Sequence, residues 1–113
     1  MRCVDINVLL YAYRDDLPQH EEYRERLNEW SNDEEPLGLP DVVLSGFVRI
    51  STNRRAFAEP AQPAEAWGRV NELLAAPAAV PLRPGPSHWD HFVGLAQQIG
   101  ARGNDITDAF LAA

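Results

Sequence analysis

The chain has 113 residues, a formal net charge of −7, and basic residues that are all arginine. This length allows one domain with a real hydrophobic core, and the 45% hydrophobic content is unlike that of a disordered chain. The acidic balance excludes a general nucleic-acid-binding protein, because phosphate contacts need a basic surface, but it is compatible with a metal-assisted nuclease or a basic protein partner. The single Cys3 cannot form an internal disulfide, and neither a membrane-length apolar run nor a signal segment is present, so we expect a cytoplasmic protein.

The first predicted elements are a short buried strand over 2–5 and an apolar helix over 7–14. Cys3 and Val4 suit a buried strand, and Asn7 is a suitable N-cap for the helix. Asp5 therefore lies among residues that are predicted to be buried. An ionised carboxylate there is costly unless a helix N-terminus, a cation or a metal ion pairs with it.

Two more helices follow, with a short strand between them. Pro18 is predicted in the first turn of the earlier helix. A polar loop over 31–36 follows this helix and leads into a minimal strand at 37–39. The apolar stripe of that helix consists of Tyr23, Leu27 and Trp30. The later helix is predicted to begin at Pro40 and Asp41. The wide apolar stripe of this helix indicates a central position in the fold.

The rest of the chain continues the alternation of helices and strands. A fourth helix is predicted with Trp67, Val70, Leu73 and Leu74 facing inward. A weak strand at 79–82, a fifth helix after 84–86 and a sixth helix over 106–113 follow. Short strands that alternate with helices predict an α/β fold with a parallel sheet, as a single domain over 1–113. The chain ends inside the sixth predicted helix without a C-cap signal, so we expect a truncated C-terminus.

Acidic residues at two places predict a metal site. Asp5 ends the first strand, and ligands bind at the carboxyl ends of strands in open α/β sheets. Asp105 and Asp108 are three residues apart and share one helical face. If that helix packs beside the first strand, the three carboxylates converge, and their oxygen ligands favour Mg²⁺ or Mn²⁺ over Zn²⁺.

A structural interpretation of the same residues stays open. Asp5 or Asn7 can cap the first helix, and Asp105 with Asp108 fits a capping box at the start of the last one. On spacing alone, capping is the favoured interpretation of the second pair. The two interpretations are compatible, because acidic residues at helix starts can also bind metal.

Other residues give weaker indications. His88 and His91 are spaced as a metal pair on a helix, but no third ligand is evident and a solvated face is the favoured interpretation. Arg54 and Arg55 suit either phosphate contact or a solvated loop with salt bridges. Arg49, on the apolar third helix, suits an ion pair with an acidic neighbour or a contact with a substrate phosphate.

Three segments stand out together: VDINVLL at 4–10, LPDVVLSGFVR at 39–49 with TNRR at 52–55, and TDAFLAA at 107–113. They resemble a known family, the PIN-domain ribonucleases, and in particular VapC toxins. Residues 4–10 (VDINVLL) resemble the opening of that family. Residues 39–49 (LPDVVLSGFVR) with 52–55 (TNRR) are similar to the third-helix region of an actinobacterial-type subgroup, and 107–113 (TDAFLAA) to the second family signature. The resemblance covers the whole chain in order.

The resemblance implies a three-layer α/β/α fold around a central parallel sheet and a metal-dependent endoribonuclease that cleaves single-stranded RNA. Asp5 matches the first family acid and Asp108 the acid of the later helix, with Asp105 as an auxiliary catalytic residue. Mg²⁺ or Mn²⁺ is the implied cofactor, held by Asp5 and Asp108. The implied assembly is a homodimer, or a heteromer with a small DNA-binding antitoxin that inserts an arginine into the acidic pocket.

Two departures from the family pattern keep an alternative open. Many members carry a Glu on the third helix where this chain has Gly46, and the family continues past the final Ala-Ala with a strand that bears another acid. The alternative is a catalytically incompetent PIN-like module that binds antitoxin or RNA. A phosphatase-like hydrolase with Asp5 as nucleophile is disfavoured, because Asn7 stands where that chemistry needs a second acid.

Overall fold

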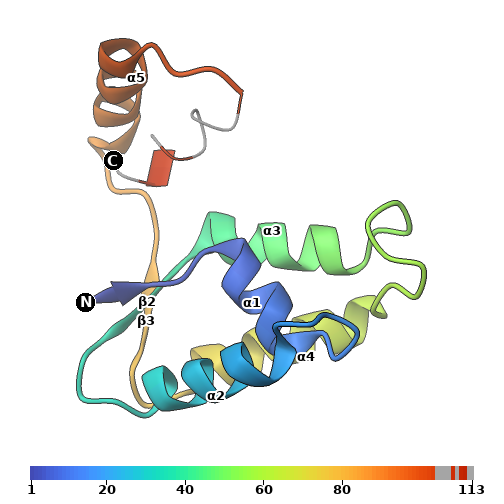
Figure 1. The fold of residues 1–113 in the computed structure, drawn as a ribbon. Helices are drawn as coiled ribbons and strands as arrows, with labels where there is room; N and C mark the ends of the chain where they lie inside the picture. The colour runs from blue at the N-terminus through green and yellow to red at the C-terminus, as the bar shows by residue number, and fades with distance from the viewer. Residues whose placement is uncertain (104–107, 109, 112–113) are drawn as a thin grey trace. The chain divides into compact units, whose positions relative to one another are not determined.

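The elements of the chain alternate between strands and helices, as expected for an α/β protein (Figure 1). The structure is a computed structural model, and it describes residues 1–103, 108, 110 and 111. In chain order the elements are β1 (Arg2–Cys3), α1 (Ile6–Tyr13), α2 (His20–Ser31), β2 (Leu37–Pro40), α3 (Asp41–Ser51), α4 (Pro63–Leu74), β3 (Ala79–Leu82) and α5 (His88–Ile99). They divide into two compact units, Met1–Leu82 and Arg83–Ala113. The prediction of one domain over 1–113 stays a prediction.

The three strands of the first unit form a parallel sheet in the order β1-β2-β3, which confirms the predicted sheet. Cys3 pairs with Gly38, and Gly38 pairs with Val80. Parallel pairing brings the carboxyl ends of all three strands to one edge. The residues that directly follow β1 and β2 therefore lie at that edge.

The short strand β1 is also held at its start by charged side chains. Arg2 pairs with Asp33 at 2.6 Å and with Glu35 at 3.3 Å, in the loop before β2. Its hydrogen bond lowers the pKa of the Asp33 carboxyl. These contacts lie at the amino ends of the strands, opposite to the edge that carries Asp5.

The burial of β1 differs from the sequence prediction. Val4 is buried, but Cys3 is exposed, so its prediction as a buried residue is wrong. Successive side chains of a strand point to opposite faces of the sheet. A Cβ on Gly38 would lie 2.9 Å from the Cys3 sulfur and 2.8 Å from Met1 Sδ, which places these residues on one face together.

The core of the first unit gathers around α3, which confirms its predicted central position. Its most deeply buried side chains, each below 2% exposed, are Phe47, Leu9, Leu37, Leu39, Val43 and Ser51. Burying one such apolar side chain stabilises the fold by about 1.5–3 kcal/mol. Figure 1 shows α1 between α2 and α3, and α1 packs against both.

Helices α1 and α3 meet at a glycine. A Cβ on Gly46 would lie 2.5 Å from Ile6 Cδ1 and 3.2 Å from Ile6 Cγ1. Ile6 therefore fills the space that a side chain at position 46 would need. This contact fixes α3 directly beside the first residue of α1, next to Asp5.

Helix starts and faces account for the other differences from prediction. Asp5, and not Asn7, is the N-cap of α1, and Pro18 lies in the turn before α2. In α4, Val70 is buried as predicted, but Trp67 is 51% exposed. More residues of α4 were predicted to face inward than its neighbours cover, because α4 packs against α3 and β3 on one face.

The second unit, described by itself, contains α5 and part of the predicted sixth helix. Gly100 ends α5 in the left-handed conformation with φ of 64°, which a glycine adopts without strain. Residues 108, 110 and 111 are helical, and the remainder of the predicted 106–113 helix lies outside the described residues. No helix in the part of the chain described is long and apolar enough to cross a membrane.

The glycine contact between α1 and α3 gives a prediction about stability. We expect Gly46→Val to lower the free energy of unfolding by about 1–3 kcal/mol, because the new side chain overpacks against Ile6. Gly68→Val on α4 is the matched control, since a Cβ there meets nothing within 4 Å. Denaturant unfolding measures both, and equal effects at the two positions would contradict the close contact.

Candidate active site

Asp5 lies two residues after the end of β1 and caps α1. Its backbone is extended, with φ of −102° and ψ of 175°, and its Oδ1 accepts a hydrogen bond of 2.9 Å from the Val8 amide. The carboxylate is exposed, so the prediction that it lies in a buried environment is wrong. The chain leaves the sheet after Val4, and a helix N-terminus stabilises the negative charge that follows.

The cap leaves part of the Asp5 carboxylate free for other chemistry. Only Oδ1 is used by the cap, and no second hydrogen bond to Asp5 occurs within the described residues. The Oδ2 atom therefore remains available to a ligand, while the cap holds the orientation of the group. For Asp5 the capping and metal-binding interpretations are compatible on one side chain.

The other two predicted acids belong to the second unit. Asp108 is helical and its side chain is exposed. Asp105 lies outside the described residues, so the capping box with Asp108 stays a prediction. The convergence of Asp5 with Asp108 also stays a prediction, since the two residues belong to different units.

The fit of a divalent cation depends on the donors that the described residues offer. No three histidine, cysteine, aspartate or glutamate side chains within the described ranges are grouped closely enough to enclose a metal ion. Mg²⁺ does not need such a cage, because it keeps several waters and binds through one or two carboxylates and substrate phosphates. An exposed, oriented carboxylate such as Asp5 fits that mode of binding.

One member of the predicted histidine pair, His88, has a structural role in the second unit. His88 Nε2 donates a hydrogen bond of 2.7 Å to the carbonyl oxygen of Phe110. Its ring meets the Phe110 ring edge-on at 4.2 Å and lies near Phe92. His88 is half-buried, so the interpretation of a solvated face is wrong for it, and one ring nitrogen is already occupied. Sequence reasoning missed that this contact anchors the segment that carries Asp108.

The candidate phosphate contacts are three exposed arginines, Arg49, Arg54 and Arg55. In the part of the chain that the structure describes, none of them forms an ion pair. The predicted ion pair of Arg49 with an acidic neighbour is therefore not found there. Phosphate contact stays a prediction for all three.

Comparison with known proteins decides the family. The family model described as PIN domain matches residues 2–113. The chain belongs to the PIN-domain family. It is 59% identical, over all 113 of its residues and 77% of the relative, to VapC ribonuclease Mb2897 of Mycobacterium bovis and to Ribonuclease VapC43 of Mycobacterium tuberculosis. Ribonuclease VapC31 of Mycobacterium tuberculosis is 38% identical over the same residues and 80% of its own length.

At position 46 of α3 this PIN chain has a glycine, whereas many relatives are expected to carry an acidic residue there. Gly46 is buried, and Ile6 occupies the position of the missing side chain. The loss of that metal contact stays a prediction. The packing shows that a carboxylate there would displace Ile6 from the contact between α1 and α3.

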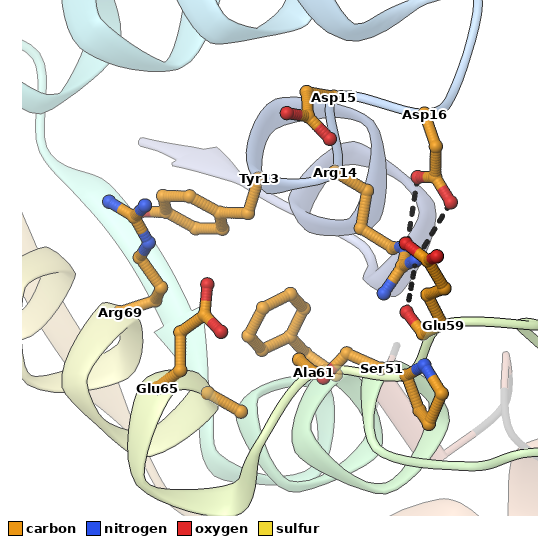
Figure 2. Close-up of a pocket in the computed structure, with 12 residues that line it drawn as sticks. Tyr13, Arg14, Asp15, Asp16, Ser51, Glu59, Ala61, Glu65 and Arg69 are labelled. Atoms are coloured by element: carbon orange, nitrogen blue, oxygen red, sulfur yellow. Dashed lines mark hydrogen bonds and ion pairs between the residues drawn. The ribbon is translucent and has the colours of Figure 1, made fainter.

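A separate cleft of about 270 Å³ lies at the other end of α1 from Asp5 (Figure 2). An eight-residue helix is about 12 Å long, so this cleft is distinct from the carboxyl edge of the sheet. Its walls come from the ends of α1, α3 and α4 and the loop between α3 and α4. They include Tyr13, Arg14, Asp16, Phe47, Ser51, Glu59, Glu65 and Arg69.

Arg14 joins the loops on both sides of this cleft. Its Nε and one terminal nitrogen donate to the two oxygens of Asp16 at 3.0 and 2.7 Å, and it donates to the carbonyl oxygen of Glu59 at 2.8 Å (Figure 2). The guanidinium also lies 3.7 Å from the centre of the Phe57 ring. With its side chain only 10% exposed, Arg14 is a structural link between α1 and the loop after α3.

Tyr13 forms the adjoining wall of the cleft. Burial raises the pKa of its phenol to about 12, while Arg69 acts in the opposite direction. Its ring packs against Phe47 with centres 5.6 Å apart. A phenol that stays neutral at physiological pH and packs in the core is a structural element, so we assign no chemistry to this cleft.

The pairing of Asp16 with Arg14 gives a prediction about pH. Hydrogen bonding to Arg14 lowers the pKa of Asp16 in the folded state. The ionised carboxylate therefore adds stability at pH values above its ordinary pKa of about 3.9, and this is lost as the pH falls through the lowered pKa. We expect Asp16→Asn to be less stable than the wild type at neutral pH, with the difference shrinking below about pH 4.

Thermal unfolding between about pH 2 and pH 7 measures this difference. Asp15→Asn is the matched control, because Asp15 is an adjacent exposed acid without an ion pair among the described residues. A pH-independent difference for Asp16→Asn would contradict the assigned ion pair.

Proposed function

We propose that this PIN-domain chain is a metal-dependent endoribonuclease that cleaves single-stranded RNA as the toxin of a toxin–antitoxin pair. One observation carries the proposal: Asp5 is an exposed, oriented carboxylate at the carboxyl edge of the sheet, in a chain that is 59% identical to proteins named VapC ribonucleases. Ligand sites of open α/β sheets lie at that edge.

The catalytic acids of the proposal are Asp5, Asp108 and, as an auxiliary, Asp105. Asp5 and Asp108 would hold a Mg²⁺ or Mn²⁺ ion, since oxygen ligands suit these cations. The chemistry that such an ion supplies when bound is stabilisation of charge on a phosphodiester and a lowered pKa of water. Asp5 contributes fixed negative charge, which its cap hydrogen bond orients.

The substrate and partner follow from charge. The formal net charge of −7 disfavours tight binding of RNA over a broad surface, so contact would be local, through exposed arginines such as Arg49 and Arg54. The same charge suits a basic antitoxin segment whose arginine neutralises the acidic pocket. Assembly as a homodimer or as a heteromer with the antitoxin, in the cytoplasm, belongs to this proposal.

A second candidate is a PIN module that binds RNA or antitoxin without cleavage. The observation that favours it is the buried Gly46, which offers no ligand where a carboxylate is expected in many relatives. Calorimetric titration with Mn²⁺ separates the candidates. A pure binding module would give no metal heat that depends on Asp5 or Asp108.

The substitution Asp5→Asn tests the nuclease proposal. Asn is as good an N-cap as Asp, so the substitution removes the charge and keeps the cap of α1. We expect RNA cleavage to fall on the order of a hundredfold, because several kcal/mol of charge stabilisation would be lost. The melting temperature should stay close to that of the wild type. Cleavage of a fluorescent single-stranded RNA in Mg²⁺ measures the effect.

Two controls sharpen this test. Asp15→Asn removes an exposed acid near the other end of α1 and should cleave like the wild type. Removing metal with EDTA should abolish cleavage, and adding Mg²⁺ or Mn²⁺ should restore it. Full cleavage by Asp5→Asn, or cleavage that persists in EDTA, would overturn the proposal.

A further inference from the structure

We infer that Asp41 is a second carboxylate of the first unit for the divalent cation, at the end of β2 beside Asp5 at the end of β1. The inference rests on the proposed metal-dependent function. It concerns which residues of this chain face the cation, and it depends on sheet register and on the environment of Asp41.

The register of the parallel sheet brings the two aspartates together. Cys3 pairs with Gly38, and the Val4 amide donates to the Gly38 carbonyl oxygen at 3.4 Å, so the pairing continues toward Asp5. When this register is continued two residues beyond the last pair, Asp5 stands level with Pro40, one residue before Asp41. Strand spacing of about 4.8 Å and a one-residue offset of about 3.3 Å put the two backbones on the order of 6 Å apart.

Both aspartates stand at the start of a helix that comes after a strand. Each follows a strand and stands at the first turn of the next helix: Asp5 is the N-cap of α1, and Asp41 is the first residue of α3. Pro40 before Asp41 keeps an extended backbone, with φ of −63° and ψ of 136°. Both carboxylates therefore stand at the amino end of a helix, where acidic side chains are favourable.

Asp41 has no partner for its charge among the residues that the structure describes. Its side chain is exposed, and the start of α3 has no side-chain cap hydrogen bond. Within the described residues it forms no ion pair and no side-chain hydrogen bond. Two neighbouring carboxylates repel each other, and a divalent cation between them relieves that repulsion.

No other residue of α3 can supply a carboxylate to the cation. Asp41 is the single acid in the sequence of α3, and Gly46 is closed off by Ile6. The strand β3 is followed by Arg83, so the sequence places no acid directly after the third strand. One or two carboxylates with waters and substrate phosphates complete the octahedral shell of Mg²⁺, so Asp5 and Asp41 fit that donor set.

Mn²⁺ titration of the metal-free chain, followed by electron paramagnetic resonance of the free ion, tests the inference. We expect Asp41→Asn to raise the Mn²⁺ Kd about tenfold, because one anionic ligand is lost. Asp41→Glu keeps the charge and should restore most of the affinity. Asp15→Asn is the matched control for loss of an exposed acid and should bind Mn²⁺ like the wild type.

The outcomes separate this inference from the proposed function. If Asp5→Asn weakens Mn²⁺ binding and Asp41→Asn does not, the role of Asp41 is overturned and the nuclease proposal stands. If the wild type neither binds Mn²⁺ nor cleaves RNA, the proposed function fails and the inference fails with it. Melting temperatures in EDTA verify folding, and Asp41→Ser, which also suits a helix start, replaces Asp41→Asn if that variant is unfolded.

Discussion

The parallel pairing of β1 with β2 is the constraint on which the candidate site depends. Strands that run in the same direction must end at the same edge, so the segments that follow β1 and β2 lie at one edge although 37 positions separate Cys3 from Pro40 in the chain. β2 passes directly into α3, and only two residues separate β1 from α1. The edge therefore receives two helix N-termini and the carboxylates that stand at them, which is a favourable place for negative charge and for the cation that balances it.

Capping and ligand binding at Asp5 support each other. The bond from the Val8 amide to Oδ1 removes one rotational freedom of the carboxylate and leaves Oδ2 free, so a ligand would meet a group that is already oriented. The contact between Ile6 and Gly46 fixes the same helix start from the other side. In this chain, Ile6 of α1 occupies the space that a side chain at position 46 of α3 would need. The acidic residue of α3 is Asp41.

Predictions from the sequence succeeded where a local signal and the global fold agreed. The strands near 37–39 and 79–82 and the central helix after Pro40 were predicted from apolar runs, proline and periodicity, and the structure confirms them. Predictions of burial were less successful. Cys3 and Trp67 are exposed because alternation and helical period define which residues share a face, and they do not define whether another element covers that face. The choice of Asp5 over Asn7 as N-cap depends on where the chain leaves the sheet, which is a tertiary event.

The sequence by itself determined the order of the elements, the family resemblance and the acid at the start of the first helix, because these depend on short-range patterns. Tertiary structure alone decided that Asp41 stands one register step from Asp5, that Ile6 closes the space at Gly46 and that Arg14 links two loops 45 residues apart. These contacts join residues that are distant in the chain, and strand register and helix packing set their distances. A linear pattern contains neither quantity.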